Sequence, residues 1–492
     1  NKLVTLANLQ WREVRMLRAY GSFMRQARFP YSRHYMEEVL SSYPLIVQST
    51  VDLFKSMHDP ALSEAQRSAQ TKAAAEKITG YLKDVQKLDH DRILRQFRTV
   101  IEKTLRTNYF QTDDSGAVMP VFAVKLDSKN IPDLPLPRPH VEMFVYSRRV
   151  EAVHLRFGEI ARGGIRWSDR HDDFRTEILG LVKSQMVKNT VIVPVGAKGG
   201  FVVKNPPKTG GREAYQQEGI ECYKIFVQAM LDLTDNNVKG KILRPQNVVC
   251  HDGIDPYLVV AADKGTATFS DIANSLSLKS KFWLGDAFAS GGSAGYDHKK
   301  MGITARGGWE SVKRHFREMG KDIQSEPFTL VGVGDMAGDV FGNAMLLSRQ
   351  MKLQGAFNHV HVFCDPNPDI AVSFAERERL FKARGGWDAY DKAKLSKGGA
   401  IFERSAKVVK LTPEIKSCFG IKEDQVTPDE LVRAILKANV ELIWFGGIGT
   451  FLKSSKQSHA DADDKSNDAL RIDANEVRAK VIGEGANLGV TQ

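Results

Sequence analysis

The sequence predicts an α/β protein in three parts: a helical segment at residues 1–110, an α/β domain at 111–288 and a Rossmann-like dinucleotide-binding domain at 289–492. Three patterns predict this fold class. Apolar residues recur every three or four positions in the first hundred residues, as in helices that bury one face. Short β-like runs then alternate with helical stretches, which is typical of α/β domains. Finally, a glycine-rich turn joins a strand-like run to a helix.

The helical segment contains two clear amphipathic stretches, "WREVRMLRAYGSFMRQ" and "LDHDRILRQFRTVIEKTL". Between them, "HDPALSEAQ" is typical of a loop that leads into a helix, with Pro60 and Ser63 as start signals. These patterns indicate packing and no chemistry.

The next domain begins with the β-like runs "AVMPVFAVKL", "VEMFVYS" and "VEAVHLRFG". A helix is predicted over "DFRTEILGLVKSQMVKN" and another over "REAYQQEGIECYKIFVQAMLDLT". Two short strands, "TVIVPV" and "FVVK", are predicted on either side of "GAKGG". The runs "NVVCHD" and "YLVVAAD" complete the domain as strands.

In the last domain, "FTLVGV" is a predicted strand, "DVFGNAMLLSRQM" a helix and "HVHVFC" a second strand. This order predicts a parallel, right-handed crossover. The runs "NVELIWF" and "AKVIGEG" are predicted as later strands of the same sheet.

Bulk properties limit the classes of function. A chain of 492 residues is too long for one core, and 42% hydrophobic with 26% charged residues is ordinary for a soluble protein. No apolar run approaches the ~20 residues that cross a bilayer, so no membrane partner is expected. The chain starts with Asn1 rather than Met and stops within sequence that looks ordered, so we expect a piece of a longer polypeptide.

The cysteines predict a reducing, cytoplasmic location and no metal site, because they lack the paired spacing of disulfide frameworks and zinc sites. They are Cys222, Cys250, Cys364 and Cys418. The pairs His171–Asp172 and His251–Asp252 are interpreted as ordinary groups rather than metal ligands.

The net charge of +11 raises the question of nucleic acid as a partner. Lysines and arginines are spread along the chain without a dense basic arm, so we expect no nucleic-acid binding. The charge then reflects either a basic surface or a cationic pocket for a small anion.

A dinucleotide site is predicted at Gly332, Gly334 and Ala337, which follow a strand and open a helix. The first glycine permits the turn, and the second lets the backbone approach a pyrophosphate. Asp365, at the end of the next predicted strand, can bind the ribose hydroxyls and repel a 2′-phosphate, which favours NAD over NADP. Asp335, inside the loop, either caps the helix or points to solvent.

A reactive site is predicted around Lys198, which stands between glycines in "VPVGAKGGF". Lys188 and Arg162 also lie at glycine-rich positions or element ends, where a scaffold presents side chains to a cleft. Clustered cations and burial lower a lysine pKa, which would let the amine exchange protons near neutral pH. Asp263, at the end of "YLVVAAD", supplies a carboxylate for moving protons.

Six motifs then stand in a recognisable order: "RGGIRWSDR", "QMVKNTVIVPVGAKGGF", "AADKGTA", "GGSAGYDHKKMGITARG", "VGVGDMAGDVFG" and "VIGEGAN". Together they resemble glutamate dehydrogenases, in particular the catalytic portion of the large NAD-dependent bacterial class. The resemblance runs from about residue 150 to the end. It implies reversible oxidative deamination of L-glutamate to 2-oxoglutarate and ammonia with NAD, and we expect a homo-oligomer in the full-length protein.

The resemblance also implies roles for single residues. Lys198 matches the catalytic lysine, which polarises the 2-oxo or imino group and activates water, and Asp263 matches the aspartate that moves protons to and from the amino nitrogen. Lys188 matches the lysine that grips the α-carboxylate. The remaining matches are Gly163 and Gly164 along the substrate, Thr304 near the nicotinamide and Asn487 beside its ribose.

The sequence departs from small hexameric relatives at Arg162, where they have a lysine for the side-chain carboxylate. A guanidinium can grip a carboxylate with two hydrogen bonds, so preference for an acidic side chain is expected to survive. The chain also ends before a further side-chain contact of the family, so we expect this portion to be weak or inactive alone.

Two other functions stay open. A dehydrogenase of another amino acid, such as leucine, needs an apolar pocket, and the cation at 162 disfavours it. A catalytically silent, regulatory nucleotide-binding domain has no need for Lys198 and Asp263.

Overall fold

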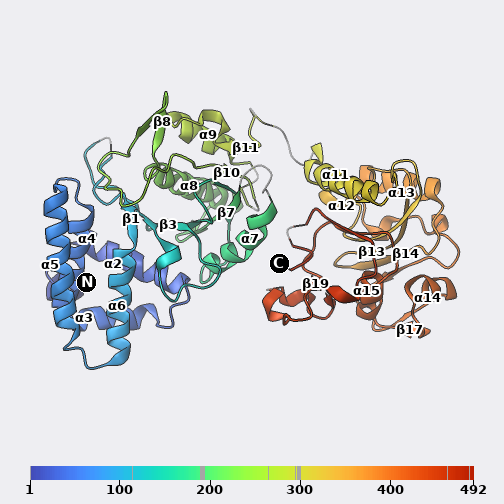
Figure 1. The fold of residues 1–492 in the computed structure, drawn as a ribbon, viewed down its shortest axis with the longest axis horizontal. Coiled ribbons are helices and arrows are strands. Elements are labelled where there is room, and N and C mark those ends of the chain that lie inside the picture. Colours follow the sequence, from blue (N-terminus) through green and yellow to red (C-terminus); the bar gives the residue numbers. More distant parts are fainter. Residues whose placement is uncertain are drawn as a thin grey trace. The chain divides into compact units, whose positions relative to one another are not determined.

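The chain forms two units in the computed structural model, Asn1–Tyr296 and Asp297–Gln492 (Figure 1). The first unit holds both the predicted helical segment and the predicted α/β domain, and the three-part division stays a prediction. The structure describes residues 2–113, 115–188, 194–263, 265–266, 268–293, 295, 301–462, 464–486 and 488–491, without the side chains of 184–188.

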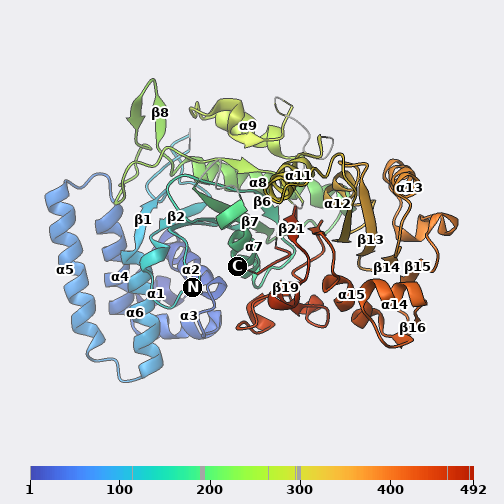
Figure 2. The same cartoon turned by 45° about the vertical axis from the view of Figure 1, so that its right-hand side comes forward.

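The described residues of the first unit begin with helices that pack on one another beside β1 and β2 (Figure 2). α5 starts at a capping box, in which Ser63 Oγ accepts from the Gln66 N–H at 3.3 Å and the Gln66 side chain accepts from the Ser63 N–H at 3.0 Å. The predicted helix start at Ser63 is therefore confirmed. The helices are α1 (Lys2–Leu6), α2 (Trp11–Gln26), α3 (Arg33–Ser42), α4 (Pro44–His58), α5 (Glu64–Leu82) and α6 (Leu88–Glu102).

A mixed sheet follows, with strand order β1-β2-β3-β4-β7-β5 and β6 also paired to β7. The helical segment and α7 (Phe174–Lys188) share one core with one face of this sheet, and α8 (Gly211–Leu231) and α9 (Ser270–Lys279) share another core with the opposite face. The strands are β1 (Thr104–Thr107), β2 (Phe122–Leu126), β3 (Val141–Tyr146), β4 (Val150–Arg156), β5 (Ala161–Arg162), β6 (Ile165–Trp167) and β7 (Val195–Val203). Short strands β8 (Asn236–Val238), β9 (Lys241–Leu243), β10 (Val260–Ala261) and β11 (Ala289–Ser290) form two small separate sheets.

One local prediction is wrong at the motif "GAKGG". The sequence predicts two short strands around it, but β7 runs through the motif without a turn. The glycines serve packing instead: a Cβ at Gly200 would lie 2.3 Å from Ile178 Cδ1 of α7, and a Cβ at Gly199 would lie 3.1 Å from the His154 ring. Lys198 thus belongs to a strand inside the sheet. The strand predicted at "TVIVPV" falls largely on residues 189–193, outside the described residues.

The segment "NVVCHD", also predicted as a strand, is irregular because it carries part of a buried ion cluster. Arg106 of β1 is fully buried, and its Nε lies 2.6 Å from Asp252 Oδ1. Its Nη1 lies 2.8 Å from Asp235 Oδ1, and its Nη2 donates to the Gly253 carbonyl at 2.9 Å.

Two further buried cations extend this cluster toward the end of the domain. Lys125 of β2 contacts both Asp252 and Asp255, and Arg156 of β4 lies 2.5 Å from Asp255 Oδ2. Burial works against ionisation of Asp255, but Arg156 and Lys125 together hold the pKa of its carboxyl well below the ordinary value. The cluster therefore ties the segment that leads into β10 to three strands of the sheet.

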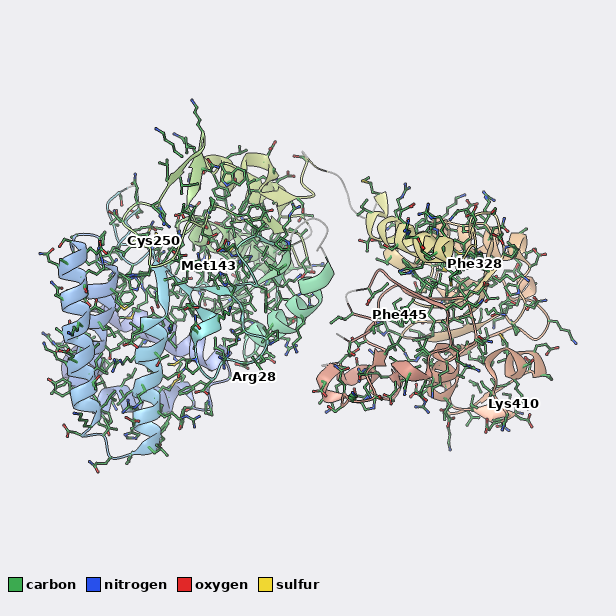
Figure 3. All side chains as sticks on the ribbon, in the orientation of Figure 1. Arg28, Met143, Cys250, Phe328, Lys410 and Phe445 are labelled. Carbon is green, nitrogen blue, oxygen red and sulfur yellow. The ribbon has the colours of Figure 1, made fainter. Side chains whose placement is uncertain are left out.

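The second unit is a Rossmann-like sheet with strand order β15-β14-β13-β12-β18-β21. β13, β12, β18 and β21 are parallel, and Figure 3 labels Phe328 and Phe445 at opposite ends of two of them, β12 and β18. The strands are β12 (Phe328–Val333), β13 (Met351–Phe357), β14 (His361–Cys364), β15 (Ala400–Glu403), β18 (Leu442–Phe445) and β21 (Val481–Glu484), with smaller pairs β16 (Val409–Lys410), β17 (Gln425–Val426), β19 (Leu452–Lys453) and β20 (Ile472–Asp473). The helices are α11 (Ile303–Glu318), α12 (Asp339–Ala344), α13 (Ile370–Ala383), α14 (Pro413–Phe419) and α15 (Pro428–Leu436).

The crossover is parallel as predicted, but its second strand is β13 and not the predicted "HVHVFC". The helix α12 ends at Ala344, and the chain turns into β13, which lies beside β12. "HVHVFC" contains β14, which returns antiparallel to β13. Antiparallel pairing reverses the strand, so the carboxyl end of β14 lies at the opposite edge of the sheet from that of β13. Among the described residues, no helix has both the length and the apolar character needed to cross a membrane.

Replacing Arg106 with methionine is expected to destabilise β1 strongly. The change leaves Asp235 and Asp252 buried beside an apolar side chain, and loss of one partner of a buried ion pair costs about 3–5 kcal/mol. Hydrogen exchange followed by mass spectrometry over peptides of β1 and β2 measures this loss. As a control, Arg244→Met removes a cation that also pairs with Asp235 but is 42% exposed, and it should cost less than about 1 kcal/mol. Equal effects of the two changes would contradict this account of the cluster.

Candidate active site

The central feature of the site is a buried ion pair between Lys198 and Asp263. Lys198 projects from the middle of β7, and Asp263 follows β10. Lys198 Nζ lies 2.5 Å from Asp263 Oδ2, and the two side chains are 8% and 21% exposed. The structure thus brings together the two residues that the sequence predicts as catalytic. Whether the pKa of Lys198 is lowered, as predicted from clustered cations, stays a prediction.

A second cation shares the same carboxylate oxygen. Arg166 of β6 donates from Nε to Asp263 Oδ2 at 3.1 Å and from Nη1 to Glu177 Oε1 at 3.0 Å. The other oxygen of Glu177 accepts from Ser168 Oγ at 2.5 Å. Within the described part of the chain, Asp263 Oδ1 has no hydrogen-bond donor, so this oxygen has lone pairs available for a proton.

The two cations fix the charge of Asp263. Burial alone raises the pKa of this carboxyl, but the charge and hydrogen bond of Lys198, and then those of Arg166, outweigh it and lower the pKa below the ordinary value. Conversely, burial works to lower the pKa of Arg166, and its bonds to Asp263 and Glu177 raise it. The site therefore holds an ionised carboxylate in a mostly dry environment.

The backbone around the pair leaves no room for side chains at Gly163 and Gly164. A Cβ at Gly163 would lie 1.5 Å from the carbonyl oxygen of Ala197, next to Lys198. A Cβ at Gly164 would lie 3.0 Å from the Ala262 carbonyl oxygen, next to Asp263. These glycines let three backbone segments meet, which is a structural reason for them beside the predicted one.

Arg162 lies on the same face of the sheet as Lys198. It pairs with Gly196 in the parallel β5–β7 ladder, and Gly196 and Lys198 are two residues apart in β7. Side chains two residues apart in a strand point to the same face. Arg162 is half-buried, and no described carboxylate lies within ion-pairing distance of its guanidinium. Among the described residues it is therefore a positive charge without a carboxylate partner, next to a cluster whose charges are paired.

The side chains of two predicted site residues lie outside the part of the chain that the structure describes. Lys188 ends α7, but its side chain lies outside the described residues, and Asn487 lies outside them altogether. Arg166 stands in the motif "RGGIRWSDR", but its partners Asp263 and Glu177 were not predicted from the sequence. The only sequence signal for them is the acidic residue Glu177 one turn into the following helix.

The predicted nucleotide turn stands at the carboxyl edge of the parallel strands in the second unit. Gly334 has a φ of 141°, which favours glycine, and a Cβ there would lie 2.7 Å from Phe341 Cβ. Within the described residues, the backbone N–H groups of Asp335 and Met336 have no acceptor. Free amides on a tight turn after a parallel strand fit a pyrophosphate.

Apart from Asn487, which lies outside the described residues, the other predicted cofactor residues lie near this turn, with one exception. Gly332 is the fifth residue of β12, and Ala337 is exposed in the turn. Thr304 of α11 lies close to Gly485, directly after β21, because a Cβ at Gly485 would be 3.6 Å from Thr304 Cγ2. The exception is Asp365.

Asp365 does not stand where the sequence places it, and its predicted role at the ribose is wrong. It follows β14, and its N–H donates to the Gln354 carbonyl at 2.9 Å, three residues before the end of β13. The carboxyl is fully buried, its Oδ1 accepts from the Ser396 N–H at 2.9 Å, and burial raises its pKa. The prediction failed because β14 runs antiparallel, which places its end at the wrong edge of the sheet.

Asp335 accepts hydrogen bonds within the turn and does not cap α12, whose N-cap is Gly338 and has no side-chain cap. Its Oδ1 accepts from the N–H groups of Ala337 at 2.9 Å and Gly338 at 3.0 Å, and its Oδ2 accepts from Asn358 Nδ2 at 2.7 Å. The sequence predicted either a helix cap or a side chain pointing to solvent, and the structure shows a third arrangement.

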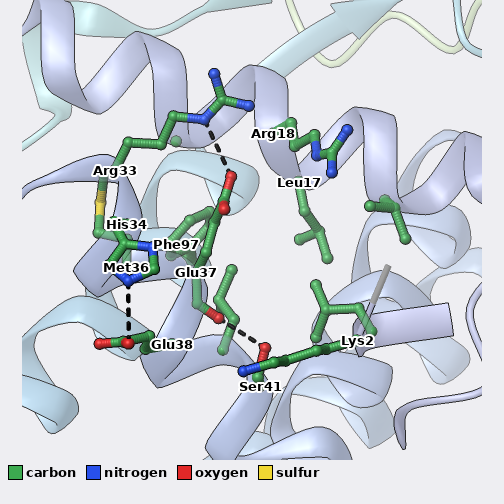
Figure 4. A pocket seen from close by; sticks show the side chains of 14 residues that line it. Lys2, Leu17, Arg18, Arg33, His34, Met36, Glu37, Glu38, Ser41 and Phe97 are labelled. Atoms are coloured by element: carbon green, nitrogen blue, oxygen red, sulfur yellow. Dashed lines mark hydrogen bonds and ion pairs between the residues drawn. The ribbon is translucent and has the colours of Figure 1, made fainter. Parts of the chain in front are cut away.

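A separate cavity of about 220 Å³ lies in the helical segment (Figure 4). Residues of α1, α2, α3 and α6 line it, and ion pairs of α3, Arg33–Glu37 at 3.0 Å and His34–Glu38 at 3.1 Å, stand at its wall. It contains none of the predicted site residues.

Comparison with known proteins gives a consistent family. The family model "Bacterial NAD-glutamate dehydrogenase, catalytic domain" matches residues 77–492, and "Glutamate dehydrogenase, helical motif 3" matches residues 1–60. The chain is 56% identical to the NAD-specific glutamate dehydrogenase of Halomonas elongata and 55% identical to that of Pseudomonas aeruginosa, over 100% of this chain and 30% and 31% of those proteins. It thus spans about a third of the length of these relatives. Among solved structures, Plasmodium falciparum glutamate dehydrogenase 2 is 12% identical, with 93% of this chain and 75% of that chain covered and a TM-score of 0.39.

Gly163→Ala is expected to destabilise the site region. The added methyl group collides with the backbone at Ala197, which cannot rotate away, so we expect a loss of at least about 2 kcal/mol. Hydrogen exchange of β7 peptides measures it. Gly80→Ala is the matched control, since nothing lies within 4 Å of its Cβ position in α5, and it should gain up to about 1 kcal/mol from helix propensity. A neutral result at Gly163 would mean that β5 and β7 are farther apart than described.

Proposed function

The chain belongs to the family of bacterial NAD-glutamate dehydrogenase catalytic domains, and from this premise we propose that the protein containing it catalyses the reversible, NAD-dependent oxidative deamination of L-glutamate. The products are 2-oxoglutarate, ammonium and NADH, with one water consumed and one proton released. The observation that carries the proposal is the buried pair of Lys198 and Asp263, with Arg166 on the same carboxylate oxygen.

Lys198 is proposed to act on the carbon that loses the amino group. An ammonium group held in a buried site stabilises negative charge that develops on a carbonyl or carbinolamine oxygen. It also orients the water that adds to the imino carbon. Because Lys198 sits on a strand inside the sheet, only its flexible stem has to adjust during these steps.

Asp263 is proposed to move protons at the nitrogen. With Oδ2 bonded to two cations, Oδ1 is the oxygen left to accept a proton from the substrate ammonium. Later it returns a proton to the leaving ammonia. The lowered pKa of Asp263 makes it a carboxylate at neutral pH, ready to act as the base.

The charges of the site support an acidic substrate. Lys198 and Arg166 face two carboxylates, Asp263 and Glu177, so these four charges balance. Arg162 adds a positive charge that has no described partner. We propose that it binds the side-chain carboxylate of glutamate and that Lys188 binds the α-carboxylate, with the backbone of Gly163 and Gly164 along the substrate.

The second unit supports NAD as the cofactor through the free amides and the glycine conformation of its turn. NAD bound there would supply the acceptor for the hydride that leaves the α-carbon. We propose that Gly332, Gly334 and Ala337 hold the pyrophosphate, with Thr304 and Asn487 toward the nicotinamide end. The cysteines, all free in the described residues, support the cytoplasm as the location. The homo-oligomer stays a prediction.

The full-length protein is expected to form NADH from NAD and L-glutamate, and to do so far better than from leucine. Replacing Lys198 with alanine should lower kcat by about a thousandfold, because it removes the charge at the reacting carbon, and should leave NAD affinity unchanged. Absorbance of NADH gives the rates and calorimetry gives the affinity. Lys224→Ala, a partly exposed lysine of α8, is the control and should keep the wild-type rate. Near-normal turnover without Lys198 would contradict the proposal.

Arg166→Gln is expected to move the acid limb of the kcat/KM profile to higher pH. The change removes a cation from Asp263 Oδ2, so burial is less compensated and the pKa of Asp263 rises. Since the carboxylate must be ionised to act as a base, activity is then lost at a higher pH on acidification. Arg170→Gln alters a cation that pairs with Asp173, whose side chain is 48% exposed, and should leave the limb in place. A downward shift, or an equal shift in both variants, would contradict this role of Arg166.

A further inference from the structure

At the position that the sequence suggested, no residue can serve as the acid that binds the adenosine ribose. In Rossmann-like folds this acid follows the second parallel strand, at the carboxyl edge of the sheet. Here that strand is β13, and the residues that follow it are Asn358 and His359, which carry no carboxylate. Asp365 lies at the other edge and is fully buried.

A carboxylate nevertheless lies near the carboxyl end of β13, and it comes from the neighbouring turn after β12. We call this place, where the turn meets the end of β13, the corner. The turn is tied to the end of β13, since the Gly334 N–H donates to the Phe357 carbonyl at 2.8 Å. Asp335 is the next residue, and its Oδ2 accepts a hydrogen bond from Asn358 Nδ2 at 2.7 Å. Asn358 is itself fixed, because its Oδ1 accepts from the N–H groups of Val360 and His361 at 2.8 and 2.6 Å.

We propose that Asp335, held in place by Asn358, is the carboxylate that binds the adenosine ribose and discriminates against a 2′-phosphate. The inference rests on the proposed use of NAD and names the residue that makes the cofactor choice. Three neutral donors hold the Asp335 carboxylate in one position without removing its charge. It remains half-buried, so part of it is accessible to a ligand.

The charges near Asp335 agree with this assignment. In the described part of the chain no cation pairs with Asp335, so its negative charge acts on whatever binds at the corner. The cation Arg404 is close to Asn358, but it is engaged: Nη1 donates to the Asn358 carbonyl at 3.1 Å and Nη2 lies 3.5 Å from Asp429. A ribose hydroxyl can donate to a carboxylate, whereas a 2′-phosphate is repelled by it.

The test is direct binding of NAD⁺ and NADP⁺ to the full-length protein by calorimetry, with wild type, Asp335→Asn and Asp335→Ser. Both replacements remove the charge and keep an oxygen that can cap the turn. We expect NAD⁺ to bind more weakly and NADP⁺ more tightly, with a change of about tenfold in the ratio of their Kd values. A purely structural role would weaken both nucleotides equally and leave the ratio unchanged, which would overturn the inference.

Asp365→Asn is the matched control, since the amide oxygen can still accept from Ser396. Asp365→Asn should leave the Kd ratio unchanged. If Asp365→Asn shifted the ratio and the Asp335 variants did not, the ribose-binding role would belong to Asp365. The result is separable from the proposed function. If the Kd ratio changes as expected but the wild type does not oxidise glutamate, only the proposed activity is refuted. If the enzyme is active but replacing Asp335 leaves the Kd ratio unchanged, only the inference is refuted. A wild type that binds neither nucleotide contradicts both.

Discussion

The first unit depends on one constraint: a lysine and an aspartate must be held in contact, away from water, at the place where β7 and the segment after β10 meet. Two buried charges are stable only when each is paired and hydrogen-bonded. Asp263 meets this condition by accepting from both Lys198 and Arg166, and Arg166 is anchored in turn by Glu177 on α7. The glycines at 163 and 164 follow from the same constraint, because the backbone segments could not come together around a side chain.

The buried cluster of Arg106, Lys125 and Arg156 supports this arrangement from the other end of the segment. Its carboxylates include Asp252 and Asp255, which lie in the segment that leads into β10, and Asp263 follows β10. The path from the sheet to Asp263 is therefore fixed by ion pairs at its start and at its end. Such a path has little freedom, which suits the proposed role of Asp263 in moving a proton.

Much of this could be predicted from the sequence, and the exceptions have physical reasons. Lys198 and Asp263 were predictable because both belong to motifs with a recognisable order. The pairing of Arg166 with Glu177 was not, because it depends on how α7 lies over β6, and periodicity does not give that. Asp365 was misplaced because the predicted helix "DVFGNAMLLSRQM" runs into the first residue of β13, and no strand was predicted at "MKLQGAF". Without β13, the next strand was taken as parallel and its end was assigned to the wrong edge.

The uninterrupted course of β7 through "GAKGG" has one more consequence. A reactive amine on a loop can be carried toward its target when the loop closes, but an amine in the middle of a paired strand stays where the ladder holds it. The ladder to β4 covers β7 from Ala197 to Val203, so a shift of the Lys198 backbone would break several hydrogen bonds at once. The backbone of Lys198 is therefore fixed, and in the proposed reaction the substrate has to be brought to it.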